Sequence, residues 1–457
     1  MAFIPAYILV LFALILIDYF MAIQIEKSSG KNKKLFLVIS IISTCFVLFV
    51  FKYFNFASYN LSALAELLHW NYPLKTLGIV LPIGLSFHTF QSLSYVIEVY
   101  KNKQKAERNL GIYSLYVMFF PQLVAGPIER PQNLLHQFYE KHIFDIQRVS
   151  DGLKLMMLGL FKKVVVADRL ALFVNQIYDN PTDYNGLSLI MATIFFAFQI
   201  YYDFSGYSDI AIGSAQVMGF NLMENFNRPY FSRSIPEFWK RWHISLSTWF
   251  KDYLYIPLGG NRVKAARWCF NIFVTFLLSG LWHGANWTFI IWGSLHGFYY
   301  MFGHFTQKIR QKFVEITRLY KLPNLQRYFQ VAITFCLVCF GWIFFRAKNI
   351  KEAFYIITHL FSGVFEGLPV VAKNFSEVVI HKHIGIYFFK LPAYELIVAI
   401  LSLLFMAFIY FAQKNETDRK LLSKKPLWLR WIVYYAMIFG IIFFGVLTKI
   451  NFIYFQF

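Results

Sequence analysis

Charged side chains are scarce in this sequence of 457 residues: they account for 15% of it, and only 24 are acidic. A soluble domain carries about 25% charged residues, so the chain lacks the polar surface that two or three soluble domains would need. Hydrophobic residues make up 58% of the chain and aromatic residues 21%. This composition excludes an ordinary soluble protein and predicts a polytopic membrane protein.

Signatures of several familiar catalytic sites are also missing. The sequence contains no GxxxxGK[ST] phosphate loop, no HExxH metal motif and no GxSxG nucleophile elbow. Cysteine is rare, and Cys336 and Cys339 form a lone CxxC inside an apolar run. A redox or metal site would need further ligands or an accessible thiolate, so we interpret both as small core residues. We therefore expect no metal site and no bound cofactor.

Basic residues are the exception, with 44 Lys and Arg giving a net charge of +20. They cluster between apolar runs, as in the loops 26–34 and 101–108 and the long stretch 226–268. This pattern predicts cytoplasmic loops that face anionic lipid, since there is no basic soluble domain to bind nucleic acid. The side of the C-terminus stays undetermined.

Apolar runs of about 20 residues predict the membrane spans. No cleavable signal peptide is evident, and the first run reads as a spanning helix. Lys52 is expected near the far end of the second span, snorkelling to the interface. No repeat or linker divides the chain, which predicts a single membrane-embedded domain over residues 1–457. The expected spans are residues 3–24, 35–57, 77–98, 153–176, 186–204, a pair within 269–304, 328–346, 394–413 and 429–448.

Three segments, 111–131, 202–219 and 279–288, are short or interrupted by Gly or Pro. Broken helices expose backbone polar groups, which survive in a membrane only where protein or water satisfies them. We therefore predict a buried cavity at these breaks.

His283 lies in one of these breaks, within "LSGLWHGANW", residues 278–287. An ionisable residue inside a membrane is a functional candidate because burying it is costly. The alternative is that His283 donates to a backbone carbonyl and only packs. Position alone leaves both interpretations open.

His243 lies in the aromatic and basic stretch "PEFWKRWHISLSTWFKDYLYIPLGGNR", residues 236–262. As one helix, this stretch would place Trp239, Trp242, His243 and Leu246 on one face. The stretch fits an interfacial amphipathic helix in which His243 is incidental, as well as a functional site.

Two acidic positions interrupt another apolar run: Asp203 and Asp209 in "QIYYDFSGYSDIAIG". They fit either a polar tunnel or ion pairs with basic groups from 226–268. Glu129 and Arg130 in "PIERP" are interpreted as part of a structural turn.

Together, several stretches resemble the membrane-bound O-acyltransferase family, in the branch of the alginate O-acetylation membrane protein and its polysaccharide-acetylating relatives. The resemblance covers most of residues 40–350. It implies an all-α fold: a polytopic ring of tilted helices, with short re-entrant helices, around a thin centre and a central tunnel. The matching stretches are "LPIGLSFHTFQSLSYVIEVY" (81–100), "FFPQLVAGPIERP" (119–131), "YYDFSGYSDIAIGSAQVMGF" (201–220), "NFNRPYFSRSIPEFWKRWHISLSTWFKDYLYIPLGGNR" (225–262) and "LSGLWHGANWTFIIWGSLHGFYY" (278–300).

The resemblance also implies an enzyme, an O-acyltransferase with His283 and His243 in the active site. His283 would take the proton of an attacking hydroxyl, since a buried neutral imidazole is a suitable base. Lys240, Arg241 and Arg262 would hold the phosphates of acetyl-CoA, or serve only as positive-inside charges. For the oxyanion, Asn286 and the backbone amides near Gly284 are candidates.

The implied reaction moves an acetyl group from a cytoplasmic thioester, acetyl-CoA or an acyl carrier, across a bacterial inner membrane. The acceptor would be an exported polysaccharide or a periplasmic acetyltransferase or carrier protein. Three alternatives stay open: D-alanyl or other acyl transfer from a carrier protein to a cell-wall polymer, a transporter, and a scaffold of an export complex. A transporter would be expected to show internal repeats, and none is evident.

Overall fold

The structure is a computed structural model that describes the chain except residues 1–4, 6, 71–75, 83, 364–388, 414–420, 448–451 and 454–457. Within the described ranges the regular secondary structure is entirely helical and contains no β-strand. This confirms the predicted all-α fold. The sequence also predicts a long polar connection over residues 365–393, and most of it lies outside the described residues.

Among the residues that the structure describes, seven helical segments are long and apolar enough to cross a membrane, which confirms a polytopic protein. Two of the seven, α20 and α21, expose many large apolar side chains, among them Leu401, Leu404, Ile432 and Phe443, which suits contact with lipid. The seven are α1 (Tyr7–Lys27), Gly30–Leu67, α9 (Gly186–Met218), α12 (Ala265–His283), α15 (Pro323–Arg346), α20 (Ala393–Ala412) and α21 (Leu427–Phe444).

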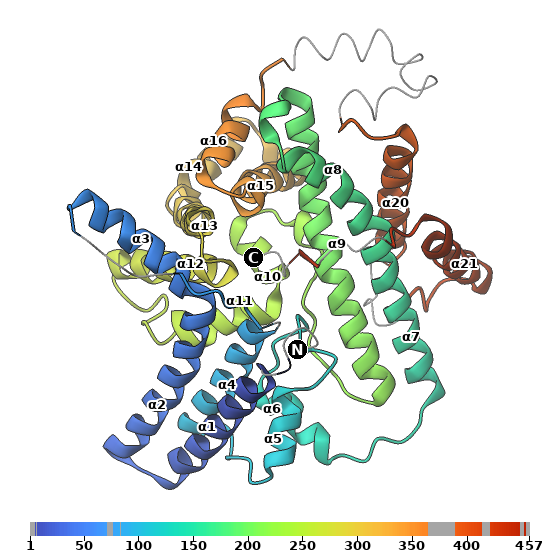
Figure 1. Ribbon diagram of the computed structural model, residues 1–457. Coiled ribbons are helices and arrows are strands. Elements are labelled where there is room, and N and C mark those ends of the chain that lie inside the picture. Colours follow the sequence, from blue (N-terminus) through green and yellow to red (C-terminus); the bar gives the residue numbers. More distant parts are fainter. Residues whose placement is uncertain are drawn as a thin grey trace.

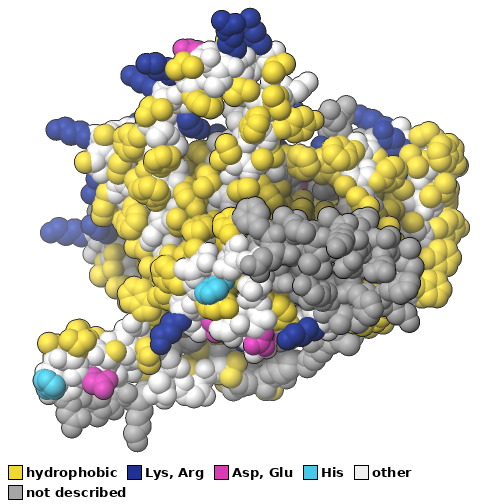
Figure 2. All heavy atoms as spheres, turned by 90° about the horizontal axis from the view of Figure 1, so that it is seen from above, with side chains coloured by type: hydrophobic (Ala, Val, Ile, Leu, Met, Phe, Trp, Pro, Cys, Tyr) yellow, Lys and Arg dark blue, Asp and Glu magenta, His cyan; other side chains and the backbone are white. Residues whose placement is uncertain are grey.

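Shorter helices fill the centre and the ends of this bundle. Figure 1 shows α10 and α11 in the middle, with α1, α2 and α4 on one side and α7 and α9 on the other. Figure 2 shows hydrophobic side chains over much of the face seen from above, with Lys and Arg projecting at its margins. The segment Gly30–Leu67 consists of α2 (Gly30–Leu48), a π-helical turn and α3 (Phe54–Leu67). The other α-helices of the described residues are α4 (Leu85–Tyr100), α5 (Leu110–Val117), α6 (Pro131–Leu134), α7 (Ile146–Phe161), α8 (Asp168–Tyr178), α10 (Ile235–Arg241), α11 (Ile244–Phe250), α13 (Trp287–Phe305), α14 (Gln307–Ile316) and α16 (Ile350–His359).

The predicted break at 202–219 is wrong, because α9 runs without interruption from Gly186 to Met218. Its glycines serve close packing against α7. A Cβ at Gly206 would lie 2.7 Å from the backbone oxygen of Gly159, and a Cβ at Gly213 would lie 2.6 Å from that of Gly152. Small residues at such crossings let two membrane helices approach closely, so here glycine marks a contact and not a break.

The other two predicted breaks are present. Helix α5 ends at Val117 and is followed by turns, and residues 284–286 separate α12 from α13. The predicted span 77–98 is helical only from Leu85 onward, after Gly84 adopts a left-handed conformation with φ of 83°. Its helix, with 16 residues, is therefore shorter than a typical span.

Buried ion pairs join α9 to a π-helical turn, η3 (Lys162–Ala167), that continues α7. The Nζ of Lys162 lies 2.6 Å from Asp209 and the Nζ of Lys163 lies 2.8 Å from Asp203. The two aspartates are thus ion-paired as one prediction held, but their partners come from η3 and not from 226–268. Each carboxylate neutralises a lysine ammonium group whose burial within the membrane would otherwise cost free energy.

Candidate active site

His283 is the last residue of α12, and the helix ends there because the chain becomes extended at Gly284. Two glycines make this end possible. A Cβ at Gly284 would collide with the ring of Phe289, and a Cβ at Gly280 would collide with the backbone oxygen of Phe289. Gly280 and Gly284 therefore let α12 and α13 cross closely next to the histidine.

Aromatic rings surround the imidazole of His283, which is 5% exposed. Its ring centroid lies 4.9 Å from that of Trp282, 5.0 Å from Trp292 and 5.1 Å from Phe345. These rings come from α12, α13 and α15, so three helices together keep bulk water away from the histidine. Electrostatic interactions in such a dry pocket are stronger than in water.

His243 lies between α10 and α11, at φ of 41° and ψ of 58°. The predicted single helix with Trp239, Trp242, His243 and Leu246 on one face is therefore wrong. The segment 225–227 holds both sides of this break. The backbone N of Asn227 donates to the oxygen of Arg241 at 2.9 Å, and Asn225 accepts from Ile244 N at 2.9 Å and from the Ser245 hydroxyl at 2.8 Å.

A left-handed conformation at a residue other than glycine costs about 1–3 kcal/mol and persists where surrounding structure enforces it, often at functional sites. His243 is fully buried and lies outside the seven long apolar helices. Burial lowers the pKa of His243 to about 3, so the imidazole is uncharged at neutral pH.

The indole of Trp282 connects the two histidines. Its ring centroid lies 4.9 Å from that of His283 and 6.0 Å from that of His243. On another side of His243, the ring centroid of Phe204 from α9 lies 4.5 Å from that of the imidazole. The fold thus brings together two histidines from different helix breaks in one aromatic pocket.

Lys52 does not snorkel to the interface as expected. It lies in a π-helical turn, η1 (Phe49–Tyr53), between α2 and α3, and points into the protein. Its Nζ donates to the backbone oxygens of Trp282 at 2.6 Å and His283 at 3.1 Å. The neighbouring Tyr53 hydroxyl donates to the oxygen of Leu281 at 2.9 Å. A cation at the C-terminal end of a helix satisfies carbonyls that have no helical partner.

A cavity of about 850 Å³ lies between α7, α9 and α20. Phe226 lines it and packs at 5.1 Å on Phe204, which in turn contacts His243. Two aromatic rings, Phe226 and Phe204, therefore connect the cavity lining to this histidine. Polar residues of the lining include Lys162, Tyr202, Asp209, Arg228, Arg241 and Tyr410.

Of the three basic residues predicted to hold donor phosphates, only Arg241 lines this cavity, and it pairs with Glu237 at 2.7 Å. Lys240 and Arg262 are exposed and are not part of the lining. A second arginine, Arg228, lines the cavity as well and lies over the Tyr410 ring at 4.3 Å. Arg241 therefore shares the cavity lining with Arg228, a residue that the sequence had not singled out.

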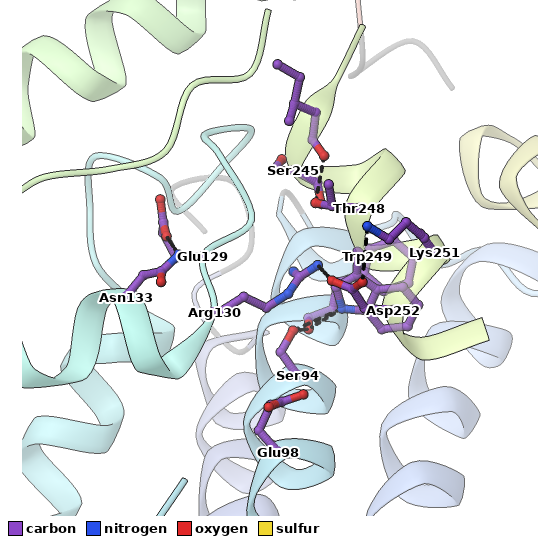
Figure 3. Close-up of polar contacts among 12 residues, drawn as sticks. Ser94, Glu98, Glu129, Arg130, Asn133, Ser245, Thr248, Trp249, Lys251 and Asp252 are labelled. Carbon is purple, nitrogen blue, oxygen red and sulfur yellow. Dashed lines mark hydrogen bonds and ion pairs between the residues drawn. The ribbon is translucent and has the colours of Figure 1, made fainter. Parts of the chain in front are cut away.

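Glu129 and Arg130 do not act as a pair. In Figure 3 Glu129 points toward Asn133, whereas Arg130 points toward Asp252. Glu129 also accepts from the backbone N of Met223, and Arg130 lies 3.5 Å from Asp252. These contacts tie the turn to 221–255 and agree with its interpretation as structural.

Asn286 is occupied by structural contacts. Its side-chain oxygen accepts from Thr288 N at 3.1 Å and caps α13, while its side-chain nitrogen donates to the oxygen of Lys348 at 3.0 Å. Both ends of the amide are therefore in use, which argues against Asn286 as an oxyanion donor. Cys336 is exposed and Cys339 buried, and both are free thiols, so only Cys339 fits the predicted core position.

The segment beyond residue 350 also reaches the centre, which the sequence did not suggest. The ring centroid of Phe452 lies 6.1 Å from that of Phe204, and the backbone N of Ile453 donates a hydrogen bond to the Asp203 carboxylate at 2.8 Å. Phe204 is thus held between His243 and a residue more than two hundred positions later.

Comparison with known proteins agrees with the resemblance. Residues 109–345 match the family described as MBOAT, membrane-bound O-acyltransferase family. The chain is 40% identical over 350 residues to "Probable alginate O-acetylase AlgI" of Pseudomonas aeruginosa, covering 76% of this chain and 64% of that protein. It is 35% identical over 402 residues to "Peptidoglycan O-acetyltransferase" of Helicobacter pylori, covering 81% and 73%.

A more remote similarity, 27% over 281 residues, links it to "Teichoic acid D-alanyltransferase" of Bacillus subtilis, covering 58% of this chain and 69% of that protein. In the comparison with the Pseudomonas protein given above, the aligned region covers 64% of the length of that relative, which is less than two thirds. His243 and His283 both fall inside the family match. On these grounds the chain belongs to the membrane-bound O-acyltransferase family.

Proposed function

We propose that this protein is a membrane O-acyltransferase that moves an acetyl group from a cytoplasmic thioester to an exported polysaccharide or to a periplasmic acetyl-carrying partner. The observation that carries the proposal is the convergence of His243 and His283 around one indole in a buried aromatic pocket. Two helix breaks far apart in the sequence create that convergence, and two buried imidazoles suit proton transfer to and from a hydroxyl.

His283 is the base in this proposal. The acceptor hydroxyl attacks the thioester carbonyl while its proton passes to the imidazole of His283. The proton then leaves with the thiol when the carbon–sulfur bond breaks. His243 orients the donor or relays the proton, since it lies across the same indole and at a turn that the hydrogen bonds of Asn225 stabilise.

Acetyl-CoA is the proposed donor, with its phosphates near Arg241 and Arg228 and its pantetheine arm in the cavity beside Phe226. Guanidinium groups bind phosphates with paired hydrogen bonds. Lys240 and Arg262 are exposed, so their proposed role is limited to attracting an anionic donor to the surface. An acyl carrier protein would present the same pantetheine arm.

The acceptor is proposed from the relatives whose printed names refer to alginate and peptidoglycan. A polysaccharide hydroxyl, or a hydroxyl of a periplasmic partner that later meets the polysaccharide, fits this chemistry. The proposed location is the inner membrane of a bacterial cell.

The test is thioester consumption by the purified protein in proteoliposomes, with acetyl-CoA labelled in the acetyl group and acceptor polysaccharide in the lumen. Wild-type protein is expected to release CoA and label the acceptor, whereas His283→Ala is expected to do neither while it elutes as a folded protein. Label that enters the lumen without loss of thioester would instead indicate a transporter. Full acetylation by His283→Ala would refute the role of this histidine. D-alanyl transfer from a charged carrier protein is the parallel assay for the alternative acyl group.

A further inference from the structure

Two buried indole N–H groups lie against His283 without a hydrogen-bond acceptor among the described residues: the Nε1 atoms of Trp282 and Trp292. Buried polar groups in folded proteins are nearly always hydrogen-bonded, and an exception calls for a functional or structural explanation. Both indoles border His283, so a reacting carbonyl oxygen in this pocket would supply the missing acceptor to the indole that it meets.

Three other buried or half-buried indoles, those of Trp249, Trp342 and Trp239, do have acceptors. The Nε1 of Trp249 donates to the Ser94 hydroxyl at 2.9 Å, that of Trp342 donates to the Tyr230 hydroxyl at 3.2 Å, and that of Trp239 donates to a ring nitrogen of His296 at 3.4 Å. The fold therefore supplies acceptors to indoles elsewhere, and the two beside His283 stand out.

Trp282 occupies the position between the histidines. Its ring contacts His283 at 4.9 Å and His243 at 6.0 Å, and it stacks on Phe90 at 5.3 Å with an interplanar angle of 22°. Its backbone oxygen accepts from Lys52. Stacking and the lysine contact hold both ends of this residue, so the direction of its N–H is preset.

Trp292 is placed differently. Its ring stacks on Trp342 at 5.8 Å and contacts His296 at 5.0 Å, on the side of α15. Among the ring contacts of the described residues, Trp292 reaches His283 but not His243. A substrate carbonyl held between the two histidines would therefore meet Trp282 first.

We propose that the indole N–H of Trp282 is the oxyanion donor of the acyl transfer, a role that rests on the function proposed above. The acceptor oxygen forms a bond to the thioester carbon, and its proton goes to His283. The carbonyl electron pair moves onto oxygen, which accepts a hydrogen bond from Trp282 Nε1. The pair then returns, the carbon–sulfur bond breaks, and the thiolate takes the proton from His283. A fixed donor in a dry pocket stabilises this oxyanion without reorganisation.

The experiment replaces Trp282 with benzothienylalanine, in which sulfur takes the place of N–H and the ring size is kept. The matched control is the same replacement at Trp268, near the opposite end of α12 from His283, whose indole N–H donates to the Tyr255 hydroxyl at 3.1 Å and whose ring packs on His304. Acetyl transfer is measured in proteoliposomes, with kcat and the donor KM determined separately. Thermal unfolding of both variants checks that the ring swap leaves the fold intact.

Loss of one oxyanion donor typically lowers kcat by about 100-fold or more. We expect that loss at Trp282, with an unchanged KM for acetyl-CoA, because the hydrogen bond strengthens only as charge develops. The Trp268 control is expected to keep kcat within about threefold of wild type. Wild-type kcat in the Trp282 variant would overturn the inference, and so would an equal loss in both variants. If wild-type protein itself consumes no thioester, the proposed function fails and not this assignment alone.

Discussion

Replacing Lys52 with methionine tests how far the position of His283 depends on an anchor from another helix. The Nζ of Lys52 donates to the backbone oxygens of Trp282 and His283, at the C-terminal end of α12. Methionine keeps the unbranched chain up to the position of Cε and removes both hydrogen bonds and the charge. The two oxygens have then lost their side-chain donor at a place shielded from water.

The size of the effect follows from these two contacts. A hydrogen bond from a charged donor contributes about 1.5–3 kcal/mol, and a cation at a helix C-terminus adds about 0.3–1 kcal/mol. Against this, methionine no longer requires the partial dehydration of an ammonium group. The net loss of unfolding free energy is therefore expected to be about 2–3 kcal/mol.

Activity should respond more strongly than stability, because the lost contacts hold the catalytic end of α12. A displacement of about 1 Å can lower a rate by about 100-fold. We expect Lys52→Met to lower kcat by about 10- to 100-fold with little change in donor KM.

The assay is acetyl transfer in proteoliposomes together with thermal unfolding, compared with Lys52→Arg and Lys33→Met. Arginine keeps the charge and the donors and is expected to restore most of the activity. Lys33 is a control, since its Nζ binds the exposed Asn102 side chain far from the pocket. Full activity of Lys52→Met at wild-type stability would refute the anchoring role.

Three further outcomes are expected. Gly206→Val should lower the free energy of unfolding by about 2 kcal/mol or more, because a Cβ at this position would lie 2.7 Å from a backbone oxygen of α7. The control is Gly303→Ala, where a Cβ would meet open space, and it should be neutral or stabilising in the same thermal unfolding assay. Arg241→Gln should raise the KM for acetyl-CoA by about tenfold at constant kcat; an equal rise in the exposed control Arg262→Gln would argue against the cavity as the phosphate site. The pKa of His243 falls from 6.5 to about 3 on burial. As the pH falls below 6.5, the unfolded chain therefore takes up a proton at His243 while the folded protein does not, and acid destabilises the fold. Stability should thus decrease as pH drops from 6.5 toward 3, and His243→Asn should flatten this decrease in unfolding curves recorded across that range; an unchanged slope would contradict it.

Much of the architecture could be predicted from local composition. Apolar run length predicted the spans around α1, α15, α20 and α21 because the requirement for about 20 apolar residues acts locally along the chain. The WHG break was predictable for a similar reason, since His283, Gly284 and Asn286 interrupt the apolar run locally. Glycine was misleading within 202–219, because the same residue that breaks a helix also lets two helices approach, and only the facing glycines on α7 distinguish the two cases.

The two histidines were identified from the sequence, but their relation was not. Residue type and position in an apolar stretch determined that His243 and His283 are costly to bury and so in need of a role. Only the tertiary structure decided that one indole lies between them, that Lys52 anchors the carbonyl ends of α12, and that Arg241 lines the cavity while Lys240 and Arg262 do not. The physical reason is that hydropathy is a property of each segment alone, whereas a ring contact, an ion pair or a cavity wall exists only once segments distant in the chain are packed together.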